Sequence, residues 1–510
     1  MKKIIGILFA VLTVFLLSSC KEDIGVTAEF SNIDIGLTSI TFTAVIDDPD
    51  AKITGAVTIK LHKADGTVAH TKDITTDEEL VDYNVSSLSN TETYTIKLYA
   101  TIGRDSVVIG EYEFELLSAA TIHITTTEQF LAMKDNRAGN YVLDNDLDFT
   151  GVTFTTPFTA AFSGTFDGQD FTISNINFTN VITYTGVFGY VSSGTIKNVN
   201  FDQITIGTID TPLAMSTSSR TGIVAGYVSS TTAKIENVTV SNSVIHYSTA
   251  STVQAFVGGL VGEFKGEMTD VELNNVEVMV KSSSYGRIRV GGAVGLLTEE
   301  AKLKRVKSDA NVEVVLDASL KNRDVQINVG GLIGYHNARN VNKSVEDLYS
   351  TGNVIVDVDF GTTNDSTSGN YSVYVGGIAG IAYSNVLNAF FAGSLELTHI
   401  KNANEEVVNK NFYVGGLMGF YGSNKAIVSA VRLGDDQEIN VNVSDDVILR
   451  ASQTFGQNIS ATIQQVGIFG DAHLMINMVD ETAGDASTVY TSLASYFTSD
   501  WMNTAYNALP

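Results

Sequence analysis

Short runs of alternating apolar and polar residues fill the chain from about residue 25 to residue 118. Examples are Ile40–Val45, Ala56–Leu61 and Tyr94–Tyr99, and polar turn residues separate them. A period of two is typical of half-buried β-strands, and Asp65-Gly66 is a tight-turn signal between two of the runs. About seven strands at this spacing predict a β-sandwich.

A glycine motif recurs through the rest of the chain. Its copies are Gly186-Val-Phe-Gly189, Ile223-Val-Ala-Gly226, Gly259-Leu-Val-Gly262, Gly292-Ala-Val-Gly295, Gly331-Leu-Ile-Gly334, Gly377-Ile-Ala-Gly380, Gly416-Leu-Met-Gly419 and Gly467-Ile-Phe-Gly470. The last glycines are separated by 33 to 51 residues, which indicates a repeated unit with loops of variable length. Such a unit cannot bury its apolar face alone, so neighbouring units must pair strand on strand. The pattern predicts a parallel β-helix, a solenoid in which glycine permits tight turns and close backbone approach.

Two further patterns accompany the motif. An apolar residue, two polar residues and another apolar residue follow several copies and indicate a bend before a half-buried strand: Ile196-Lys-Asn-Val199, Ile235-Glu-Asn-Val238, Met268-Thr-Asp-Val271 and Leu303-Lys-Arg-Val306. The position two before the last glycine of the motif predicts an aliphatic stack in the interior: Val187, Val224, Leu260, Ala293, Leu332, Ile378, Leu417 and Ile468. The next position is also apolar, so it is either covered by inserts or forms an exposed stripe for a partner: Phe188, Ala225, Val261, Val294, Ile333, Ala379, Met418 and Phe469.

These motifs resemble known families. The copies are similar to the GLUG repeat, named for its Gly-Leu-any-Gly core, and Tyr141–Phe149 with Phe162–Ile176 resembles the entry segment that precedes such repeats. The stretch Tyr83–Tyr94 resembles the fibronectin type III pattern of a leucine followed by a tyrosine. The resemblance implies a bacterial surface protein, adhesin-like or accessory, and it implies location better than chemistry.

The start of the chain predicts export. Ile4–Leu17 is an apolar run with the length of a signal-peptide core, and it follows Met1-Lys2-Lys3. The residues Leu17-Ser18-Ser19-Cys20 resemble the bacterial lipobox, which implies that Cys20 carries acyl chains, palmitate among them, and anchors the protein to a membrane. Lys21-Glu22-Asp23 resembles the acidic tag that sends lipoproteins of Bacteroides-like bacteria to the outer face of the outer membrane. The alternatives are an ordinary signal peptide with an incidental cysteine, and a lipoprotein that faces the periplasm.

Composition narrows the classes of partner. The formal net charge of -26 repels nucleic acid, so binding through a basic patch is excluded. With 44% hydrophobic residues the chain is a folded protein and not an acidic disordered tail. Cys20 is the only cysteine, so no internal disulfide is expected and stability must come from packing.

No catalytic or metal-ligating set is expected. The histidines at 62, 70, 123, 246, 336, 399 and 473 have no zinc-ligand spacing, and there is no nucleophile elbow, P-loop or dinucleotide fingerprint. Asp144-Asn-Asp-Leu-Asp148 carries oxygen ligands at alternate positions as calcium loops do, but lacks the glycine and glutamate of such loops, so capping of the chain is the preferred interpretation. No cofactor is expected.

Together these features predict an all-β protein, an N-terminal β-sandwich followed by a parallel β-helix. The expected segments are a signal peptide (1–19), the lipidated Cys20 with a tether (20–24), a fibronectin type III or Ig-like sandwich (25–118), a GLUG-repeat β-helix (119–475) and a C-terminal cap (476–510) that contains Trp501. The expected function is a non-enzymatic, adhesin-like lipoprotein on the cell surface that binds a glycan or a host or bacterial surface protein. The alternatives are a lyase-like, polysaccharide-degrading enzyme and a purely structural component of the envelope.

Overall fold

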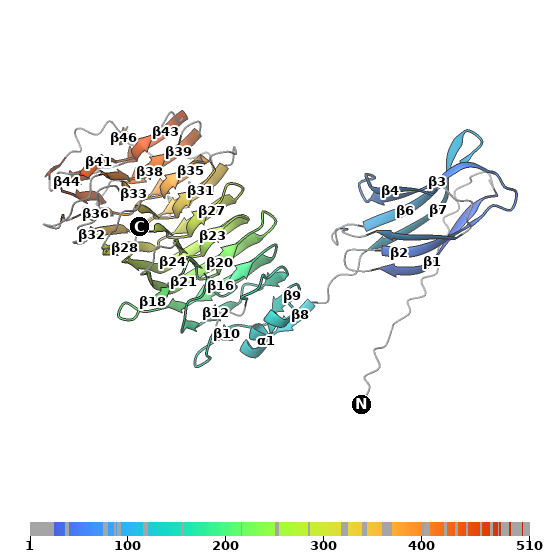
Figure 1. The fold of residues 1–510 in the computed structure, drawn as a ribbon, viewed down its shortest axis with the longest axis horizontal. Coiled ribbons are helices and arrows are strands. Elements are labelled where there is room, and N and C mark those ends of the chain that lie inside the picture. Colours follow the sequence, from blue (N-terminus) through green and yellow to red (C-terminus); the bar gives the residue numbers. More distant parts are fainter. Residues whose placement is uncertain are drawn as a thin grey trace. The chain divides into compact units, whose positions relative to one another are not determined.

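The computed structural model of the 510-residue chain describes residues 25–35, 40–74, 80–85, 88, 93–115, 121–154, 158–215, 217–249, 254–283, 286–317, 325–338, 344–359, 370–399, 401, 409–422, 426–433, 437–444, 447–458, 462–469, 473–477, 479–480, 489–490 and 502. The chain forms two compact units, Met1–Ala120 and Thr121–Pro510 (Figure 1). The predicted signal peptide, Cys20 with its tether, Trp501 and most of the predicted C-terminal cap lie outside the described residues.

The first unit consists of two antiparallel sheets. One has the order β1-β2-β5 and the other β4-β3-β6-β7. Their strands are β1 (Thr27–Ile35), β2 (Ile40–Asp47), β3 (Ile53–Lys63), β4 (Val68–Ile74), β5 (Leu80–Val85), β6 (Thr93–Ile102) and β7 (Asp105–Glu115). Alternate residues of both sheets, among them Phe42, Ile59 and Leu98, share one hydrophobic core. The predicted turn at Asp65-Gly66 joins β3 to β4, where Gly66 has a φ of 83° that its missing Cβ permits.

The second unit is built around a sheet of 23 strands, nearly all of them parallel. These strands are β8 (Thr121–Ile124), β9 (Asn140–Leu143), β10 (Leu147–Asp148), β11 (Thr165–Asp167), β12 (Thr172–Ser174), β13 (Asn177–Phe178), β16 (Thr195–Asp202), β17 (Thr205–Ile206), β18 (Leu213–Met215), β21 (Lys234–Thr249), β24 (Glu267–Ser282), β27 (Lys302–Ser308), β28 (Asn311–Asp317), β31 (Ser344–Ser350), β32 (Val354–Asp359), β35 (Asn385–Phe391), β36 (Leu395–His399), β39 (Ala426–Leu433), β40 (Glu438–Asn442), β43 (Thr462–Phe469), β44 (His473–Ile476), β45 (Val479–Asp480) and β46 (Val489–Tyr490). Each repeat along the chain adds its strands beside those of the repeat before it (Figure 1).

Two parallel sheets of eight strands each complete the second unit. We call them sheet A and sheet B. Sheet A contains β14 (Tyr184–Thr185), β19 (Ser219–Thr221), β22 (Ala255–Gly258), β25 (Arg287–Gly291), β29 (Val325–Gly330), β33 (Asn370–Gly376), β37 (Asn409–Gly415) and β41 (Val447–Ser452). Sheet B contains β15 (Tyr190–Val191), β20 (Ala225–Val228), β23 (Val261–Phe264), β26 (Val294–Leu297), β30 (Ile333–His336), β34 (Ala379–Ala382), β38 (Met418–Tyr421) and β42 (Phe455–Asn458).

The predicted fold class, an N-terminal β-sandwich followed by a parallel β-helix, is wrong in its larger part, the parallel β-helix. Over the described residues the protein is mostly strand, and its dominant elements are large parallel sheets of 23, 8 and 8 strands, not a closed or solenoid β-helix. Two strands of one repeat, β27 and β28, pair with the same 16-residue strand β24, so both enter the largest sheet. Alternation indicates which side of a strand is buried, but not which sheet the strand joins.

The glycine motif lies at the passage from sheet A to sheet B. Backbone crowding explains its composition, because a Cβ on Gly292 would lie 2.0 Å from the carbonyl oxygen of Gly331 in the next repeat. The predicted last copy, Gly467–Gly470, is misplaced, since β43 pairs with β39 in the largest sheet. In the repeat that follows, the residue equivalent to Gly419 is instead Gly456, in the segment Gln453-Thr454-Phe455-Gly456. Polar residues replace the glycine and the leucine there, which hid this copy from the pattern.

Both apolar columns of the motif are buried. The predicted interior stack from Val187 to Ile468 is at most 3% exposed. The second column is at most 2% exposed from Phe188 to Met418, and the side chain of Phe469 lies outside the described set. The proposal that this second column forms an exposed stripe for a partner is therefore wrong. Each copy from Gly186–Gly189 to Gly416–Gly419 packs both of its central side chains into the unit's core.

The four-residue signature that follows the motif places one residue of each strand in a left-handed conformation. Asn198, Asn237, Asp270, Arg305 and Asp347 have φ values of 51° to 57° and occupy equivalent positions in β16, β21, β24, β27 and β31. The side-chain amide of Asn237 donates to Asn198 Oδ1 and to Asp170 Oδ1, each at 3.1 Å. The expected bend is confirmed, but it lies inside a continuous strand.

Helix α1 (Thr127–Ala132), followed by the 3-10 helix η1 (Met133–Asp135), lies next to β8 and β9 where the second unit begins (Figure 1). The side-chain oxygen of Thr126 accepts a hydrogen bond from the backbone N–H of Gln129, and the side-chain oxygen of Gln129 accepts one from the backbone N–H of Thr126. Phe130 is fully buried and its ring contacts those of Phe149, Phe166 and Phe188. The helix thus places an aromatic side chain in the first layer of the core.

Candidate functional site

A double row of side chains runs along the outward faces of sheets A and B. We call it the outer ladder. In sheet A its register positions are Tyr184, Arg220, Phe256, Arg289, Asn328, Tyr374, Tyr413 and Arg450. In sheet B they are Tyr190, Tyr227, Glu263, Leu296, Tyr335, Ile381, Phe420 and Gln457. The flanking residues of the same strands, such as Ile288 and Val290 beside Arg289, point into the core, so strand alternation directs the ladder to the opposite side.

The first end of the ladder is a group of three tyrosines. The ring centroids of Tyr184, Tyr190 and Tyr227 are 5.3 to 5.4 Å apart, and all three side chains are partly exposed. The Arg220 guanidinium lies 5.0 Å from the Tyr227 centroid and donates a hydrogen bond to the Glu263 carboxylate. Burial, and then the nearby Glu263 carboxylate, raise the pKa of Tyr227. This end therefore offers aromatic faces whose neighbouring charges neutralise each other.

The centre of the ladder is closed. Phe256, Leu296, Tyr335 and Ile381 form a buried apolar cluster that is separate from the core of the unit. The Arg289 guanidinium lies between two of these rings, 4.9 Å from the centroid of Phe256 and 4.3 Å from that of Tyr335. Stacking of this kind holds the cation in place against the rings.

The side-chain amide of Asn328, at the centre of the ladder, is buried without hydrogen bonds to the described residues and so lowers the stability of the fold. Asn328 has no exposed surface, and among the described residues neither its amide nitrogen nor its amide oxygen has a hydrogen-bond partner. A buried amide without partners destabilises a fold by about 1–3 kcal/mol. Its neighbours in the ladder are Arg289 and Tyr374, so the unpaired amide belongs to the aromatic and arginine row.

The far end of the ladder is a stack with an exposed cation on top. The rings of Tyr374 and Tyr413 are parallel, with centroids 4.6 Å apart and an interplanar angle of 4°. Phe420 meets both edge-on, at 6.0 and 6.3 Å. The guanidinium of Arg450 lies 5.1 Å from the centroid of Tyr413, and its side chain is exposed. Within the described part of the chain, Arg450 has no ion-pair partner.

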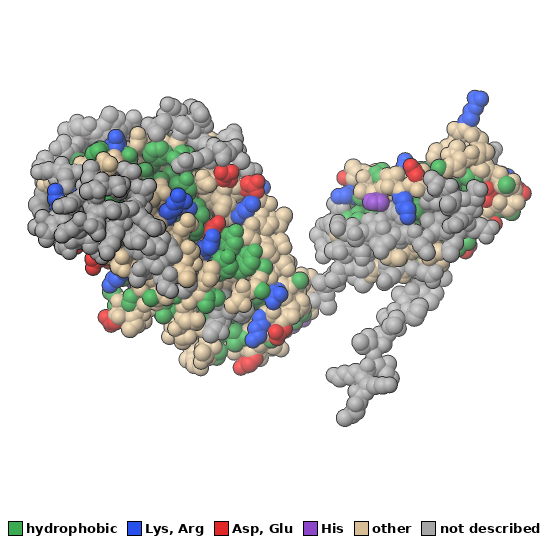
Figure 2. Space-filling view, in the orientation of Figure 1, with side chains coloured by type: hydrophobic (Ala, Val, Ile, Leu, Met, Phe, Trp, Pro, Cys, Tyr) green, Lys and Arg blue, Asp and Glu red, His purple; other side chains and the backbone are tan. Residues whose placement is uncertain are grey.

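The net charge of the ladder is opposite in sign to the net charge of the chain. The whole chain carries a formal charge of -26, while the ladder holds three arginines and one glutamate. Figure 2 shows hydrophobic side chains with basic side chains beside them on the visible face of the second unit, over the region where Figure 1 labels β20 and β23. Aromatic faces with local positive charge in an acidic protein mark this surface as the candidate site.

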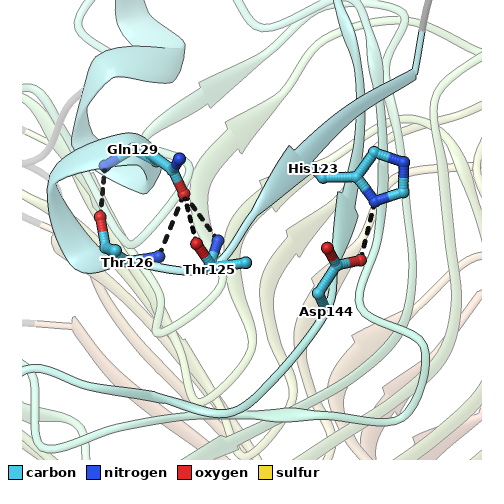
Figure 3. Close-up of polar contacts among 5 residues, drawn as sticks. All are labelled: His123, Thr125, Thr126, Gln129 and Asp144. Carbon is cyan, nitrogen blue, oxygen red and sulfur yellow. Dashed lines mark hydrogen bonds and ion pairs between the residues drawn. The ribbon is translucent and has the colours of Figure 1, made fainter.

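In the segment Asp144–Asp148, considered as a calcium loop, one carboxylate oxygen of each aspartate contacts another group of the protein. Asp144 Oδ1 lies 2.8 Å from His123 Nδ1, near the Thr125, Thr126 and Gln129 contacts that begin α1 (Figure 3). Asp146 accepts the backbone N–H of Thr172, and Asp148 accepts from Thr150 and Asn175. In the part of the chain that the structure describes, no three His, Cys, Asp or Glu residues are grouped for metal binding. These carboxylates tie neighbouring turns together.

The histidines are spread over seven different strands and do not converge. Two of them contact acidic side chains, His123 with Asp144 and His246 with Glu277, each at 2.8 Å. Cys20, the predicted site of lipidation, lies outside the described residues. None of the helices in the described segments is long and apolar enough to span a membrane.

The sequence does contain a signal for the outer ladder, which is a fixed distance along the chain from the glycine motif. In most repeats a further glycine directly precedes the motif, and the sheet A member stands two residues before that glycine, as in Phe256-Val-Gly258 and Tyr413-Val-Gly415. Sheet B members directly follow its last glycine, as in Gly226-Tyr227 and Gly334-Tyr335. Residues at one fixed offset in each repeat fall in one row, whatever the loop lengths between them.

Comparisons with known proteins add little. No family model and no curated protein match the chain. Two solved structures of β-glucuronidase from Parabacteroides merdae, one with glycerol in its active site, match 34% of this chain at 11% and 9% identity, with TM-scores of 0.15 and 0.16. The chain spans only 30% and 29% of the length of those chains. A likeness this low carries no argument about fold or activity.

Proposed function

We propose that this protein is a non-enzymatic, adhesin-like lipoprotein that binds a glycan through the outer ladder. Lipid on Cys20 would anchor it to the outer membrane, with the second unit facing the cell exterior. The observation that carries the proposal is the pair of partly exposed aromatic groups in the outer ladder, around Tyr227 and around Tyr413.

The chemistry of the ladder favours a saccharide over an apolar partner. The faces of aromatic rings carry partial negative charge, and the C–H groups of a sugar ring stack against them. Tyrosine hydroxyls and the Arg220–Glu263 pair stand beside the rings and supply hydrogen-bonding groups for sugar hydroxyls. A row of equivalent positions, one per strand, also matches a ligand made of repeated units.

Binding is tested on a glycan array with the lipoprotein purified in detergent. We expect saturable binding that the double variant Tyr227→Ala/Tyr413→Ala loses, while Tyr227→Phe/Tyr413→Phe keeps it because the ring faces remain. The bound glycan should be recovered with its chain length unchanged. Shortening of the glycan would instead support the degrading enzyme, and an array without any binding would leave only a structural role in the envelope.

Anchoring and display are tested in cells. Labelled palmitate should be incorporated into the protein, and Cys20→Ala should abolish incorporation and release the protein from membranes. Protease added to intact cells should cut the displayed protein. Survival of the protein in intact cells, with cleavage only after lysis, would contradict surface display and leave the periplasm-facing alternative.

A further inference from the structure

We infer that the ligand of the outer ladder is an extended polysaccharide bearing carboxylate groups, and that one chain of it contacts both ends of the ladder. This inference rests on the proposed glycan binding and adds the length and charge of the glycan. Three features of the ladder carry it: its two accessible ends, the distance between them and the placing of its unpaired charge.

Partly exposed aromatic rings of the ladder lie only towards its two ends. Tyr184, Tyr190 and Tyr227 at one end, and Tyr413 and Phe420 at the other, are partly exposed. Between them Phe256, Leu296, Tyr335 and Ile381 are only 2% to 8% exposed, so their faces are already covered. A ligand therefore meets two separate aromatic sites and not one continuous platform.

The ends are too far apart for a short ligand. Tyr227 stands on β20, the second strand of sheet B, and Tyr413 on β37, the seventh strand of sheet A. Five strand steps at about 4.8 Å each give a separation of about 24 Å. A disaccharide reaches only one of the two sites, whereas a polysaccharide can occupy both. Because the second contact is then intramolecular, the affinity for a long chain exceeds that of either site alone.

The charge is asymmetric along the ladder. At the first end the Glu263 carboxylate hydrogen-bonds Arg220 and neutralises it. At the far end Arg450 is exposed, stacks on Tyr413, and has no ion-pair partner in the described chain. A guanidinium held by an aromatic ring presents its N–H edge, which matches the two oxygens of a carboxylate. A sugar acid that contacts the partly exposed Tyr413 can therefore place its carboxylate against Arg450.

The test compares charged and uncharged forms of the same polymer, and long with short chains. The probes are polygalacturonate, its fully methyl-esterified form and digalacturonate, with polymannuronate as a second acidic polymer. Affinities are measured by titration calorimetry with the detergent-solubilised protein and with Tyr227→Ala, Tyr413→Ala and Arg450→Gln. Tyr227→Phe and Tyr413→Phe keep the rings. Arg287→Gln removes an exposed arginine of the same sheet that is not a member of the ladder.

We expect at least one acidic polymer to bind at least tenfold more tightly than digalacturonate. Either Tyr→Ala change should reduce the polymer's affinity at least tenfold, and the Tyr→Phe changes less than threefold. Arg450→Gln should abolish the preference for the free acid over its methyl ester and most of the salt dependence, whereas Arg287→Gln should preserve both. Equal effects of the two arginine variants would mean that any positive charge on this surface attracts the acidic polymer, and would overturn the role of Arg450.

The failure of this inference differs from the failure of the proposed function. Equal affinity for short and long chains, or sensitivity to only one tyrosine, overturns two-site binding. Equal affinity for the ester and the acid, or no binding of either acidic polymer while a neutral glycan binds through Tyr227, overturns the acidic ligand. In each of these cases glycan binding itself stands. Only the absence of binding to every glycan, on the array and in titration, removes the function on which the inference rests.

Discussion

At the scale of single residues, backbone conformation and crowding decide which residue types the second unit accepts. Gly292 has no left-handed φ, but a neighbouring carbonyl occupies the space where a Cβ would lie. Asn198 and Asn237 are conformational positions, because asparagine tolerates the left-handed conformation better than most residues. The side-chain amide of each also donates a hydrogen bond to the preceding repeat. Two kinds of special position, one steric and one conformational, thus recur once per repeat.

Crowding predicts that Gly292→Ala is strongly destabilising. The added methyl would lie 2.0 Å from Gly331 O, so two strands must move apart, at a cost of about 3 kcal/mol. Gly151→Ala is the matched control, because its Cβ would have no neighbour within 4 Å and only the φ of 75° opposes it, at about 1–2 kcal/mol. Thermal unfolding of both variants checks this. A smaller loss for Gly292→Ala than for Gly151→Ala would contradict it.

The left-handed column predicts a difference between two substitutions at Asn237. Asn237→Gly loses the two side-chain hydrogen bonds but accepts the φ of 52°, whereas Asn237→Ala loses the bonds and also strains the backbone. We expect the alanine variant to be less stable than the glycine variant by about 1–2 kcal/mol, measured by denaturant unfolding. An alanine variant as stable as the glycine variant would show that the strand adjusts its conformation at this position.

At the scale of elements, α1 is the one short helix that starts the second unit, and two independent interactions hold it. The Thr126–Gln129 pair satisfies backbone donors at its start, and Phe130 packs against three other phenylalanines. A helix of six residues is not stable alone, so tertiary packing must supply most of its stability.

This comparison predicts that Phe130→Ala costs more than Thr126→Ala. Removing the buried ring should destabilise the second unit by about 3–5 kcal/mol, and removing the cap by about 1 kcal/mol. Hydrogen exchange of β8, β9 and β11 should report the loss first, because these strands adjoin the helix. Equal effects of the two substitutions would mean that the cap, and not the ring, holds the helix.

The sequence predicted strand segments well and their assembly poorly. Ile40–Val45 and Tyr94–Tyr99 lie within β2 and β6, because a period of two directly reflects which side chains are buried. The predicted assembly, a parallel β-helix, was wrong, since nothing local in the sequence shows that β27 and β28 both pair with β24. The outer ladder was missed because its members differ in residue type from repeat to repeat, so only their fixed offset from the glycine motif links them.

At the scale of the whole molecule, acidic charge is distributed over stacked strands and is locally crowded. Glu313 on β28 is an example. Burial, and then the nearby carboxylates of Asp357 and Glu277, raise its pKa above the ordinary value of 4.5. A carboxyl with a raised pKa in the folded protein favours folding while it is protonated, and that contribution is lost as the pH rises through its raised pKa.

Glu313→Gln should therefore increase stability at pH 7 and leave it nearly unchanged at pH 4. The gain should develop as the pH rises from about 4.5, the ordinary value, through the raised pKa of Glu313. Melting temperatures measured from pH 4 to pH 8 check this. Glu346→Gln is the control, because its carboxylate pairs with Lys304 at 3.1 Å and its removal should bring no gain. A gain for Glu313→Gln that is the same at every pH would contradict the expectation.

The equivalence of positions from repeat to repeat has an evolutionary consequence. Each strand of sheets A and B contributes one residue to the outer ladder, so duplication or deletion of one repeat in the gene lengthens or shortens the row by one strand, about 4.8 Å, and leaves every other contact in register. Recombination between repeats can thus change the length of this surface in fixed increments while the fold stays the same. Substitution at the two offset positions changes its chemistry independently, and the lineage can adjust reach and selectivity by separate genetic routes.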